Sequence, residues 1–560
     1  MAIGLIYKTQ RKYLKKGKLT ESVSVEKRME NKEIIENGLG VVGIEFGSTR
    51  IKSVLIDDKG TVLASGDFTW ENSLVDGIWT YDIELIHKGL RESYKNLVND
   101  VKDKYGVSLK KIKSLGISAM MHGYLAFDKD DNLLVPFRTW RNTITGQAAD
   151  KLTELFNFNI PERWSISHLY QAILNKEEHV KDIAFFTTLA GYIHYRLTGK
   201  KVLGVGDASG MFPIDSKTKN YNQDMLGKFK DLIKPEGFAW DIEAILPEVL
   251  VAGDDAGTLT AEGAAFLDET GALEAGALLA PPEGDAGTGM TATGSVKIRT
   301  GNVSAGTSVF AMVVLEKPVE NLHREIDIVT TPSGDDVAMV HCNNCTSDIN
   351  AWANVFAGFL KAAGKDVDMN EVYTTMFKSA LNGKEDCDGV VSYNYFSGEQ
   401  ITGLVTGRPL VVRKENADFS FENFMRANLY SAVASLKIGL DILADEEKVS
   451  IDKMVGHGGF FKTPVVGSRI MAAAMNSPVT TLKTAGEGGP WGMALLALYS
   501  AKKKDGTTSA TLNDFLYGEI FGADGGETVN PEAADVAGFN KFMEDYKAGL
   551  AVERCAVDTI

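Results

Sequence analysis

Two passages of similar design, separated by nearly half of the chain, constrain the fold more than any other feature of the sequence. Residues 41–66 read VVGIEFGSTRIKSVLIDDKGTVLASG, and residues 295–318 read SVKIRTGNVSAGTSVFAMVVLEKP. Each places a tight turn of small and hydroxyl residues between two runs of apolar and β-branched residues, which is typical of a β-hairpin. Because each passage opens one half of the chain, the sequence predicts a duplicated domain.

The tips of the two hairpins are suited to phosphate. Gly47-Ser48-Thr49 forms the first tip and Gly306-Thr307-Ser308 the second. Such tips leave backbone N–H groups free, add hydroxyl donors and carry no bulky side chain. One such turn is weak evidence, because small turns join strands in all proteins. Two at matching positions predict a nucleotide bound between the halves. The motif GxxxxGK[ST] does not occur, so neither turn is a P-loop.

Length and composition exclude several classes of protein. A chain of 560 residues is too long for one core and indicates at least two domains. A net charge of −16 argues against a nucleic-acid binder, and no apolar run predicts a membrane span. Four cysteines do not suggest a disulfide framework, which favours a cytoplasmic protein. The CNNC segment at 342–345 has metal-like spacing, but no second such pair accompanies it.

The domain organisation follows from these features. Residues 1–20 contain six basic and no acidic residues, so we expect residues 1–40 to be a disordered extension. Met29 as the working start and a targeting segment are the alternatives. Residues 41–294 are predicted to form one domain and residues 295–520 a second. We expect residues 521–560 to pack as a C-terminal helical segment.

Several further segments carry a family resemblance. They are SAMMHGYLAFD (118–128), PFRTWRN (136–142), PPEGDAGTGMTATG (281–294), YFSGEQ (395–400), VGHGGFFKTPVVGSRIMAAAMNSPV (455–479) and GEGGPWGMALLALY (486–499). With the two hairpins, their order resembles the FGGY family of carbohydrate kinases, a branch of the sugar kinase, Hsp70 and actin superfamily. This order is much more specific than any single segment.

The resemblance implies an α/β fold of two actin-like ATPase (ribonuclease H-like) domains flanking a deep cleft. It implies a kinase that uses ATP and Mg²⁺ on a small sugar, without nucleic-acid or membrane partners. The Met-His-Gly segment points to a ketopentose, D-xylulose or L-ribulose. Another ketose or polyol kinase, an inactive sugar-binding relative and a mechanical ATPase stay open as alternatives, as does a homodimer.

The resemblance also implies roles for particular residues. Asp285 is expected to be the catalytic base, to contact the sugar and to face Mg²⁺ together with Glu45. Glu45 stands where the family usually has the shorter Asp. The residues expected to contact the sugar are Met121, His122, Trp140 and Arg141. The residues expected to bind the nucleotide are Gly47, Ser48, Thr49, Gly306, Thr307, Ser308, Gly458 and Gly459.

Three positions depart from the xylulokinase pattern. Arg141 and Asn142 replace the usual Asn-Asp after the tryptophan, and Ala286 replaces the Asn that often follows the catalytic Asp. These positions are where the stereochemistry of hydroxyl groups would be read. The sequence therefore leaves the identity of the ketose open.

Overall fold

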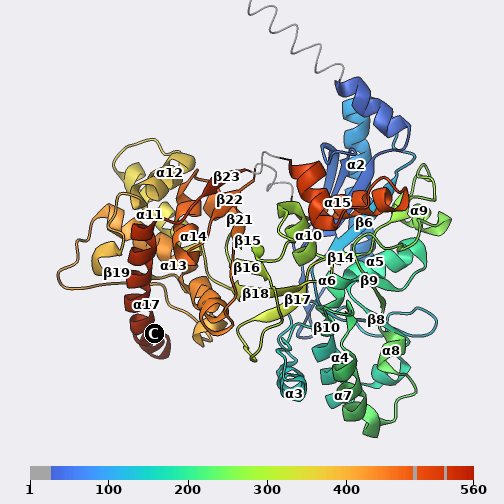
Figure 1. The fold of residues 1–560 in the computed structure, drawn as a ribbon, viewed down its shortest axis with the longest axis horizontal. Coiled ribbons are helices and arrows are strands. Elements are labelled where there is room, and N and C mark those ends of the chain that lie inside the picture. The colour runs from blue at the N-terminus through green and yellow to red at the C-terminus, as the bar shows by residue number, and fades with distance from the viewer. Residues whose placement is uncertain (1–26, 483–487, 523–525) are drawn as a thin grey trace, which may run out of the picture.

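The computed structural model describes residues 27–482, 488–522 and 526–560, and it shows two α/β domains, each built around its own sheet (Figure 1). The first sheet has the order β13–β6–β1–β2–β3, and β14 also pairs with β6. Its strands are β1 (Val41–Phe46), β2 (Arg50–Ile56), β3 (Val62–Thr69), β6 (Ser114–Ala119), β13 (Leu278–Leu279) and β14 (Glu283–Gly284). Strand β1 is antiparallel to β2 and parallel to β6, so the first predicted hairpin lies at the centre of this sheet.

The second sheet repeats this pattern and has the order β17–β18–β16–β15–β21–β22–β23. Its strands are β15 (Thr300–Ala305), β16 (Val309–Val314), β17 (Asp327–Thr330), β18 (Asp336–Cys342), β21 (Lys453–His457), β22 (Val479–Thr481) and β23 (Glu527–Val529). Strand β15 is antiparallel to β16 and parallel to β21, as β1 is to β2 and β6. The expected pair of actin-like α/β domains is confirmed.

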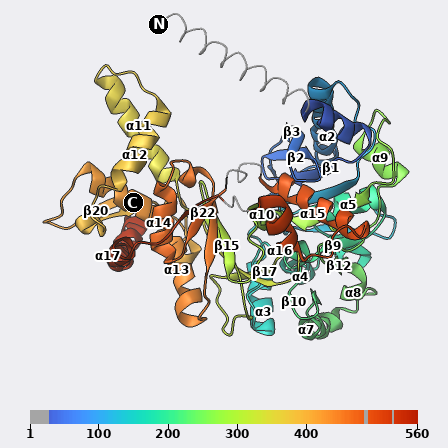
Figure 2. The ribbon, with the colours of Figure 1, turned by 45° about the horizontal axis from the view of Figure 1, so that its top comes forward.

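Helices and short strands complete each domain. Those of the first domain are β4 (Ser73–Val75), β5 (Ile78–Thr80), α2 (Ile83–Tyr105), β7 (Leu125–Phe127), α3 (Gly146–Phe156), α4 (Ser165–Leu174), β8 (Phe185–Thr187), α5 (Leu189–Thr198), β9 (Val202–Gly204), α6 (Val205–Ala208), β10 (Ile214–Asp215), β11 (Asn220–Tyr221), α7 (Gln223–Ile233), α8 (Ile242–Ile245), β12 (Glu248–Leu250), α9 (Ala261–Leu267) and α10 (Asp285–Thr293). Those of the second domain are α11 (Ser347–Ala362), α12 (Met369–Ala380), β19 (Val390–Tyr393), β20 (Leu410–Arg413), α13 (Phe421–Asp441), α14 (Val466–Met475) and α17 (Ala533–Thr559). Figure 2 shows α11 and α12 at the outer end of the second domain.

Helix α15 (Gly488–Lys504) follows β22 in the chain but packs in the first domain, against β1, β6 and α10 (Figure 1). Glycines make this close approach possible. A Cβ at Gly43 of β1 would overlap the backbone of Pro490 and Ala494, and one at Gly116 of β6 would overlap the side chain of Met493. The short helix α16 (Leu512–Phe515) joins the same core. The expected boundaries at residues 294 and 520 stay predictions.

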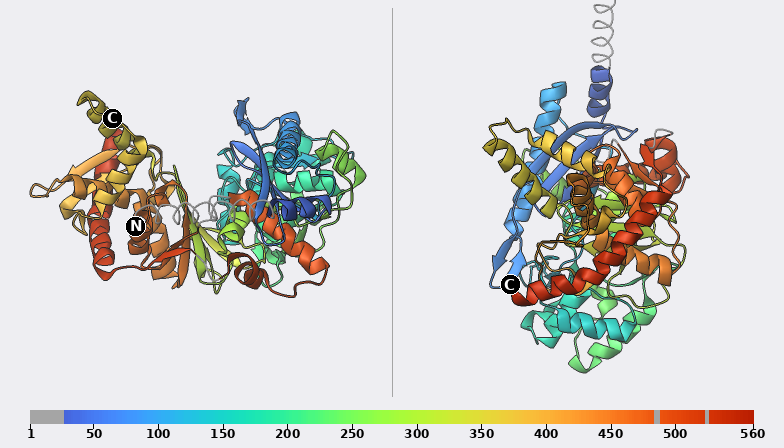
Figure 3. Two further views of the ribbon diagram at one scale, coloured as in Figure 1. Left: turned by 90° about the horizontal axis from the view of Figure 1, so that it is seen from above. Right: turned by 90° about the vertical axis from the view of Figure 1, so that its left-hand side faces the viewer.

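The two domains also touch through the inner edge of the second sheet. Strands β15–β18 lie on the side of the second domain that faces the first (Figure 3, left). Thr330 of β17 donates its hydroxyl to the carbonyl of Val205 at 3.0 Å. Asn159 donates its amide to the carboxylate of Asp327 at 2.9 Å. The strand at this edge of the second sheet therefore contacts the wall of the first domain.

The N-terminal part of the chain differs in one stretch from the disordered extension that we expected for residues 1–40. Residues 27–36 form a helix, and Ile35 of that helix is buried in the first-domain core. The expectation of disorder as far as residue 40 is therefore wrong for this stretch, because its apolar residues find a partner surface. Residues 1–26 lie outside the described part of the chain.

At the other end, α17 packs on the second domain, where Tyr546 donates its hydroxyl to Tyr395 at 2.7 Å. Among the helices described, none is both long and apolar enough to cross a membrane.

Candidate active site

The tip of the first hairpin is held from behind by three hydrogen bonds to consecutive carbonyl groups. Trp70 Nε1 donates to the carbonyl of Gly47 at 2.7 Å, and Tyr81 Oη donates to that of Ser48 at 2.6 Å. The backbone N–H of Trp70 donates to the carbonyl of Thr49 at 3.1 Å. In a trans peptide the carbonyl and the following N–H point in opposite directions. The N–H groups of Ser48 and Thr49 therefore face away from this support, where an anion can accept them.

The tip of the second hairpin has the same construction. Thr346 donates its backbone N–H and its hydroxyl to the carbonyl of Gly306, at 3.0 and 2.7 Å. The N–H of Cys345 donates to the carbonyl of Thr307 at 2.9 Å. The N–H groups of Thr307 and Ser308 therefore face the opposite side. A Cβ at Gly306 would meet no atom of the described chain within 4 Å, so a ligand has room there. Cys345, the last residue of the CNNC segment, is therefore one of the residues that support this hairpin.

The predicted adenosine-binding glycines lie beside the second tip. His457 at the end of β21 pairs with Ser304 of β15. Gly458 follows with a left-handed φ of 101°, and a Cβ there would overlap the carbonyl of Ala305. The structure therefore brings Gly458 and Gly459 next to the second hairpin. Their role in binding adenosine stays a prediction.

Asp285 is the first residue of α10, directly after β14. Its Oδ1 accepts the N–H of Met121 at 3.2 Å, and its side chain remains accessible to solvent. Desolvation of the carboxyl group by the surrounding protein raises the pKa of Asp285 to about 6, although the N–H groups of Met121 and Ala286 lower it in part. A carboxylate with this pKa accepts a proton readily near neutral pH.

Glu45, near the end of β1, lies close to Asp285. The hydroxyl of Thr288 is 3.4 Å from Glu45 Oε2 and 3.2 Å from the carbonyl of Asp285. A Cβ at Gly489 would overlap the Glu45 carboxylate, so this carboxylate lies over the first turn of α15. Burial, and then the negative charge of Asp285, raise the pKa of Glu45 to about 8.

This pair of carboxylates fits a divalent cation. Within the described residues neither Glu45 nor Asp285 forms an ion pair, and the negative charge of Asp285 disfavours the charged form of Glu45. A cation between them would offset that charge. Mg²⁺ uses one or two protein carboxylates and completes its shell with water and phosphate oxygens. The donor set therefore suits Mg²⁺, although the described residues contain no group of three or more potential metal ligands.

Sequence reasoning missed two buried carboxyl groups behind Asp285. Glu283 accepts the N–H groups of Gly206 and Asp207 at 3.3 and 3.1 Å, and Asp207 accepts the hydroxyl of Thr188 at 2.6 Å. Burial, and then the charge of Asp207, raise the pKa of Glu283 to about 8. Burial also raises the pKa of Asp207 to about 7. Glu283 could have been found from its place two residues before Asp285, whereas nothing in the sequence distinguishes Asp207.

The predicted sugar residues fall into two groups. Met121 and His122 follow β6 and adjoin Asp285 through the N–H of Met121. His122 is buried, with a φ of 70°, and its Nδ1 lies 3.2 Å from the carbonyl of Gly210. Burial, and then the charge of Arg163, hold the pKa of His122 well below its usual range. The ring is therefore neutral. A proton on Nδ1 bonded to the Gly210 carbonyl leaves Nε2 as an acceptor for a hydroxyl.

Trp140 and Arg141 form the second group. Trp140 is 38 % exposed, and the Arg141 guanidinium lies 3.8 Å from the centre of the Trp79 ring. No hydrogen bond or ion pair among the described residues joins either side chain to Asp285. Trp164, which sequence reasoning did not single out, stacks on His122 with 6.2 Å between ring centroids.

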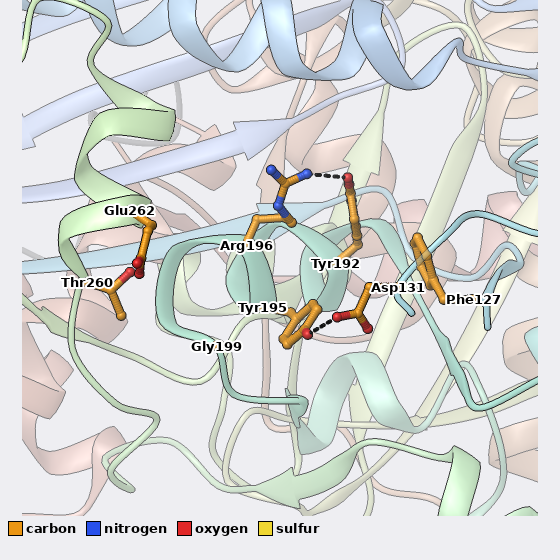
Figure 4. A pocket seen from close by; sticks show the side chains of 8 residues that line it. All are labelled: Phe127, Asp131, Tyr192, Tyr195, Arg196, Gly199, Thr260 and Glu262. Carbon is orange, nitrogen blue, oxygen red and sulfur yellow. Dashed lines mark hydrogen bonds between the residues drawn. The ribbon is translucent and has the colours of Figure 1, made fainter. Parts of the chain in front are cut away.

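A separate pocket of about 270 Å³ lies elsewhere on the first domain (Figure 4). Its hydrogen bonds run from Arg196 to Tyr192 at 3.0 Å and from Tyr195 to Asp131 at 2.5 Å. None of the predicted site residues lines this pocket. The candidate active site is therefore the surface around Asp285, Glu45 and the first hairpin. It also includes the second hairpin and the neighbouring Gly458 and Gly459.

The two sheets with matching hairpins, and the carboxylates beside the first of them, define a two-domain ATPase fold of the actin-like class. Comparison with known proteins narrows this class. The N-terminal domain of the FGGY family of carbohydrate kinases matches residues 40–272, and the C-terminal domain of that family matches residues 301–501. The chain belongs to the FGGY family of carbohydrate kinases and is a sugar phosphotransferase.

Similar proteins cover nearly the whole chain at low identity. A xylulose kinase from Haemophilus influenzae is 23 % identical over 530 residues, which are 91 % of this chain and 99 % of that protein. The structure of a xyloylose kinase from Brucella ovis has a TM-score of 0.72 at 18 % identity, covering 92 % of this chain and 99 % of that one. A glycerol kinase from Plasmodium falciparum, solved with ADP, has a TM-score of 0.71 at 16 % identity, covering 92 % and 98 %. At these identities the solved structures show the shared fold alone.

Proposed function

We propose that this chain transfers the γ-phosphate of ATP to a ketopentose, D-xylulose or L-ribulose, in a reaction that requires Mg²⁺. One observation carries the proposal: the N–H of Met121, in the Met-His-Gly segment, holds Oδ1 of Asp285 beside Glu45. A predicted sugar-binding segment, the proposed base and a proposed metal ligand thus adjoin one another. The xylulose kinase names among the relatives agree with a ketopentose.

The residues of this site have separate tasks in the proposed reaction. Asp285 Oδ2 takes the proton from the attacking sugar hydroxyl while Oδ1 stays bonded to Met121. The outward N–H groups of the two hairpin tips bind phosphate oxygens, as phosphoryl transfer requires. Mg²⁺, when bound, neutralises charge on the phosphates. His122 Nε2 accepts a sugar hydroxyl. General-base assistance of this kind contributes roughly 10²–10⁴-fold to the rate.

The test is ADP release from ATP and Mg²⁺ over a panel of D-xylulose, L-ribulose, D-ribulose and glycerol. The proposal expects turnover with a ketopentose and its loss in Asp285→Asn, with thermal unfolding unchanged. Turnover with glycerol alone would assign the chain to polyols. ATP hydrolysis without sugar would identify an ATPase, and sugar binding without turnover an inactive relative. Each of these three results overturns the proposal.

We further propose that the enzyme works in the cytoplasm on free sugar and ATP. The four cysteines, Cys342, Cys345, Cys387 and Cys555, are all free thiols, as in a reducing compartment. A homodimer stays open as the oligomeric state, and sedimentation of the purified protein would decide it.

A further inference from the structure

The segment from Trp70 to Tyr81 joins two parts of the candidate site. Trp70 follows β3, and Tyr81 lies between β5 and α2. Their rings stack with 4.0 Å between centroids and 21° between planes, and the two residues are only 3 % and 1 % exposed. Rings packed in this way have little freedom to move, so the polar atoms they carry are fixed in place.

On one side this pair holds the first phosphate hairpin. Trp70 Nε1 holds the carbonyl of Gly47, and because that carbonyl shares a peptide with the N–H of Ser48, it fixes that N–H as well. Tyr81 Oη holds the carbonyl of Ser48 and in the same way fixes the N–H of Thr49. Each of these two outward donors therefore has its own support.

On the other side the segment holds the predicted sugar-binding stretch. The N–H of Trp79 donates to the side-chain oxygen of Asn142, and the Asn142 amide donates to the carbonyl of Trp79, both at 2.8 Å. The N–H of Thr139 donates to the same carbonyl at 3.1 Å. The residues on either side of Trp140 and Arg141 are thus tied to a backbone position two residues before Tyr81.

We propose that Tyr81 is a positioning residue of the phosphoryl transfer. It aims the N–H of Thr49 at the transferred phosphate and, through Trp79, keeps that donor at a fixed separation from the sugar-binding stretch at Thr139–Asn142. The inference rests on the proposed function, in which the first hairpin meets the γ-phosphate and the stretch around Trp140 meets the sugar.

Removing the hydroxyl of Tyr81 isolates this role. In Tyr81→Phe the ring still stacks on Trp70, but the carbonyl of Ser48 loses its buried partner and its peptide can rotate. The N–H of Thr49 is then no longer held toward the phosphate. Loss of one fixed donor to a transition-state charge costs roughly 10²–10³-fold in rate, and a donor that is only misaligned costs less. We expect kcat to fall about tenfold or more.

Tyr105→Phe is the matched control. Tyr105 lies in the same domain, away from both hairpin tips. Its hydroxyl donates to the carbonyl of Leu63 at 3.0 Å and accepts the side-chain amide of Asn31 at 3.4 Å. Each variant loses one tyrosine-to-carbonyl hydrogen bond, so a purely structural role predicts similar shifts of the melting temperature and similar kinetics. The proposal expects similar melting shifts but a lower kcat in Tyr81→Phe alone, with its KM for sugar within about twofold of the wild type.

A binding measurement separates this proposal from the proposed function. Calorimetry with Mg²⁺ and either ADP or a non-hydrolysable ATP analogue is carried out on the wild type and on both variants. The proposal expects Tyr81→Phe to weaken binding of the ATP analogue several-fold and to leave ADP unchanged, because only the analogue carries a γ-phosphate. If no sugar is phosphorylated by the wild type, the proposed function fails, and this measurement still decides the role of Tyr81. Equal analogue affinities in Tyr81→Phe and Tyr105→Phe would overturn the inference.

Discussion

Replacing Gly489 by alanine tests the placement of Glu45 without changing any charged residue. Gly489 lies in the first turn of α15, and the Glu45 carboxylate occupies the space that a Cβ would take. Non-bonded carbon atoms keep about 3.5 Å apart, so the end of the Glu45 side chain must move by about an ångström or more. The obstacle is the free end of a flexible side chain rather than backbone, so the backbone around it can stay in place.

We expect Gly489→Ala to affect the free energy of unfolding and kcat in opposite directions. Alanine is preferred over glycine in a helix by roughly 0.5–1 kcal/mol, so the free energy of unfolding should stay level or rise slightly. A displacement of about 1 Å at a reacting centre can cost about 10²-fold in rate. We therefore expect Gly489→Ala to lower kcat by about tenfold to a hundredfold. The concentration of Mg²⁺ required for half-maximal rate should rise, because the Glu45 carboxylate leaves its place beside Asp285.

The assay is the initial rate of ADP release as Mg²⁺ is varied at saturating sugar and ATP, with chemical unfolding measured in parallel. Gly358→Ala is the control, because Gly358 lies within α11 of the other domain and a Cβ there would meet nothing within 4 Å. It should gain a similar helix preference and keep wild-type kinetics. An unchanged Mg²⁺ requirement in Gly489→Ala would refute the assignment of Glu45 to the metal.

Three further predictions concern the base, the second hairpin and the sugar. Asp285, the proposed base, has a pKa raised to about 6 and must be deprotonated to accept a proton. The value of kcat/KM should therefore fall as the pH drops through about 6. A profile that is flat from about pH 5 to 7 would contradict this. Gly458→Ala should lower the free energy of unfolding by about 1–3 kcal/mol and weaken nucleotide binding, because a Cβ there strains the left-handed backbone and overlaps Ala305. Chemical unfolding and calorimetry measure the two effects. Trp140→Ala should raise the KM for sugar several-fold and change stability by less than about 0.5 kcal/mol, because Trp140 is 38 % exposed; an unchanged KM would exclude sugar contact.

The central strands were predictable from the sequence because their signals are local. The hairpin predicted within residues 41–66 is formed by β1 and β2, and the hairpin predicted within residues 295–318 is formed by β15 and β16. Runs of apolar residues that end in glycine turns fix such strands whatever surrounds them. The segment 455–479, one of those that carry the family resemblance, contains α14 (Val466–Met475). Residues 486 and 487, the first two of the segment at 486–499, lie outside the described residues.

The supports of the site could not be predicted in this way. Trp70 and Tyr81 are ordinary core aromatics in the sequence, and only the fold places them under the first hairpin. Asp207 lies far along the chain from Glu283, and no spacing rule joins them. The packing of α15 on the first sheet depends on the absence of a side chain at Gly43, which reads as one glycine among many. In each case the information is a long-range contact rather than a motif.

Helix α10, which carries Asp285, and helix α15, which lies against Glu45, are the helices next to the crossings between the domains. Asp285 begins α10, which leads into β15 of the second domain, and α15 follows β22 of that domain and places Gly489 beside Glu45. The two helices pack in direct contact, since a Cβ at Gly492 would overlap the carbonyl of Thr288. The carboxylates of Asp285 and Glu45 therefore lie where the domains join, whereas the tip of the second hairpin belongs to the second domain. Domain closure by rotation about this junction would change the distance between the hairpin tips far more than the distance between the carboxylates. Such a closure would keep the proposed base and the proposed metal ligand at a fixed separation while the second hairpin tip approaches them.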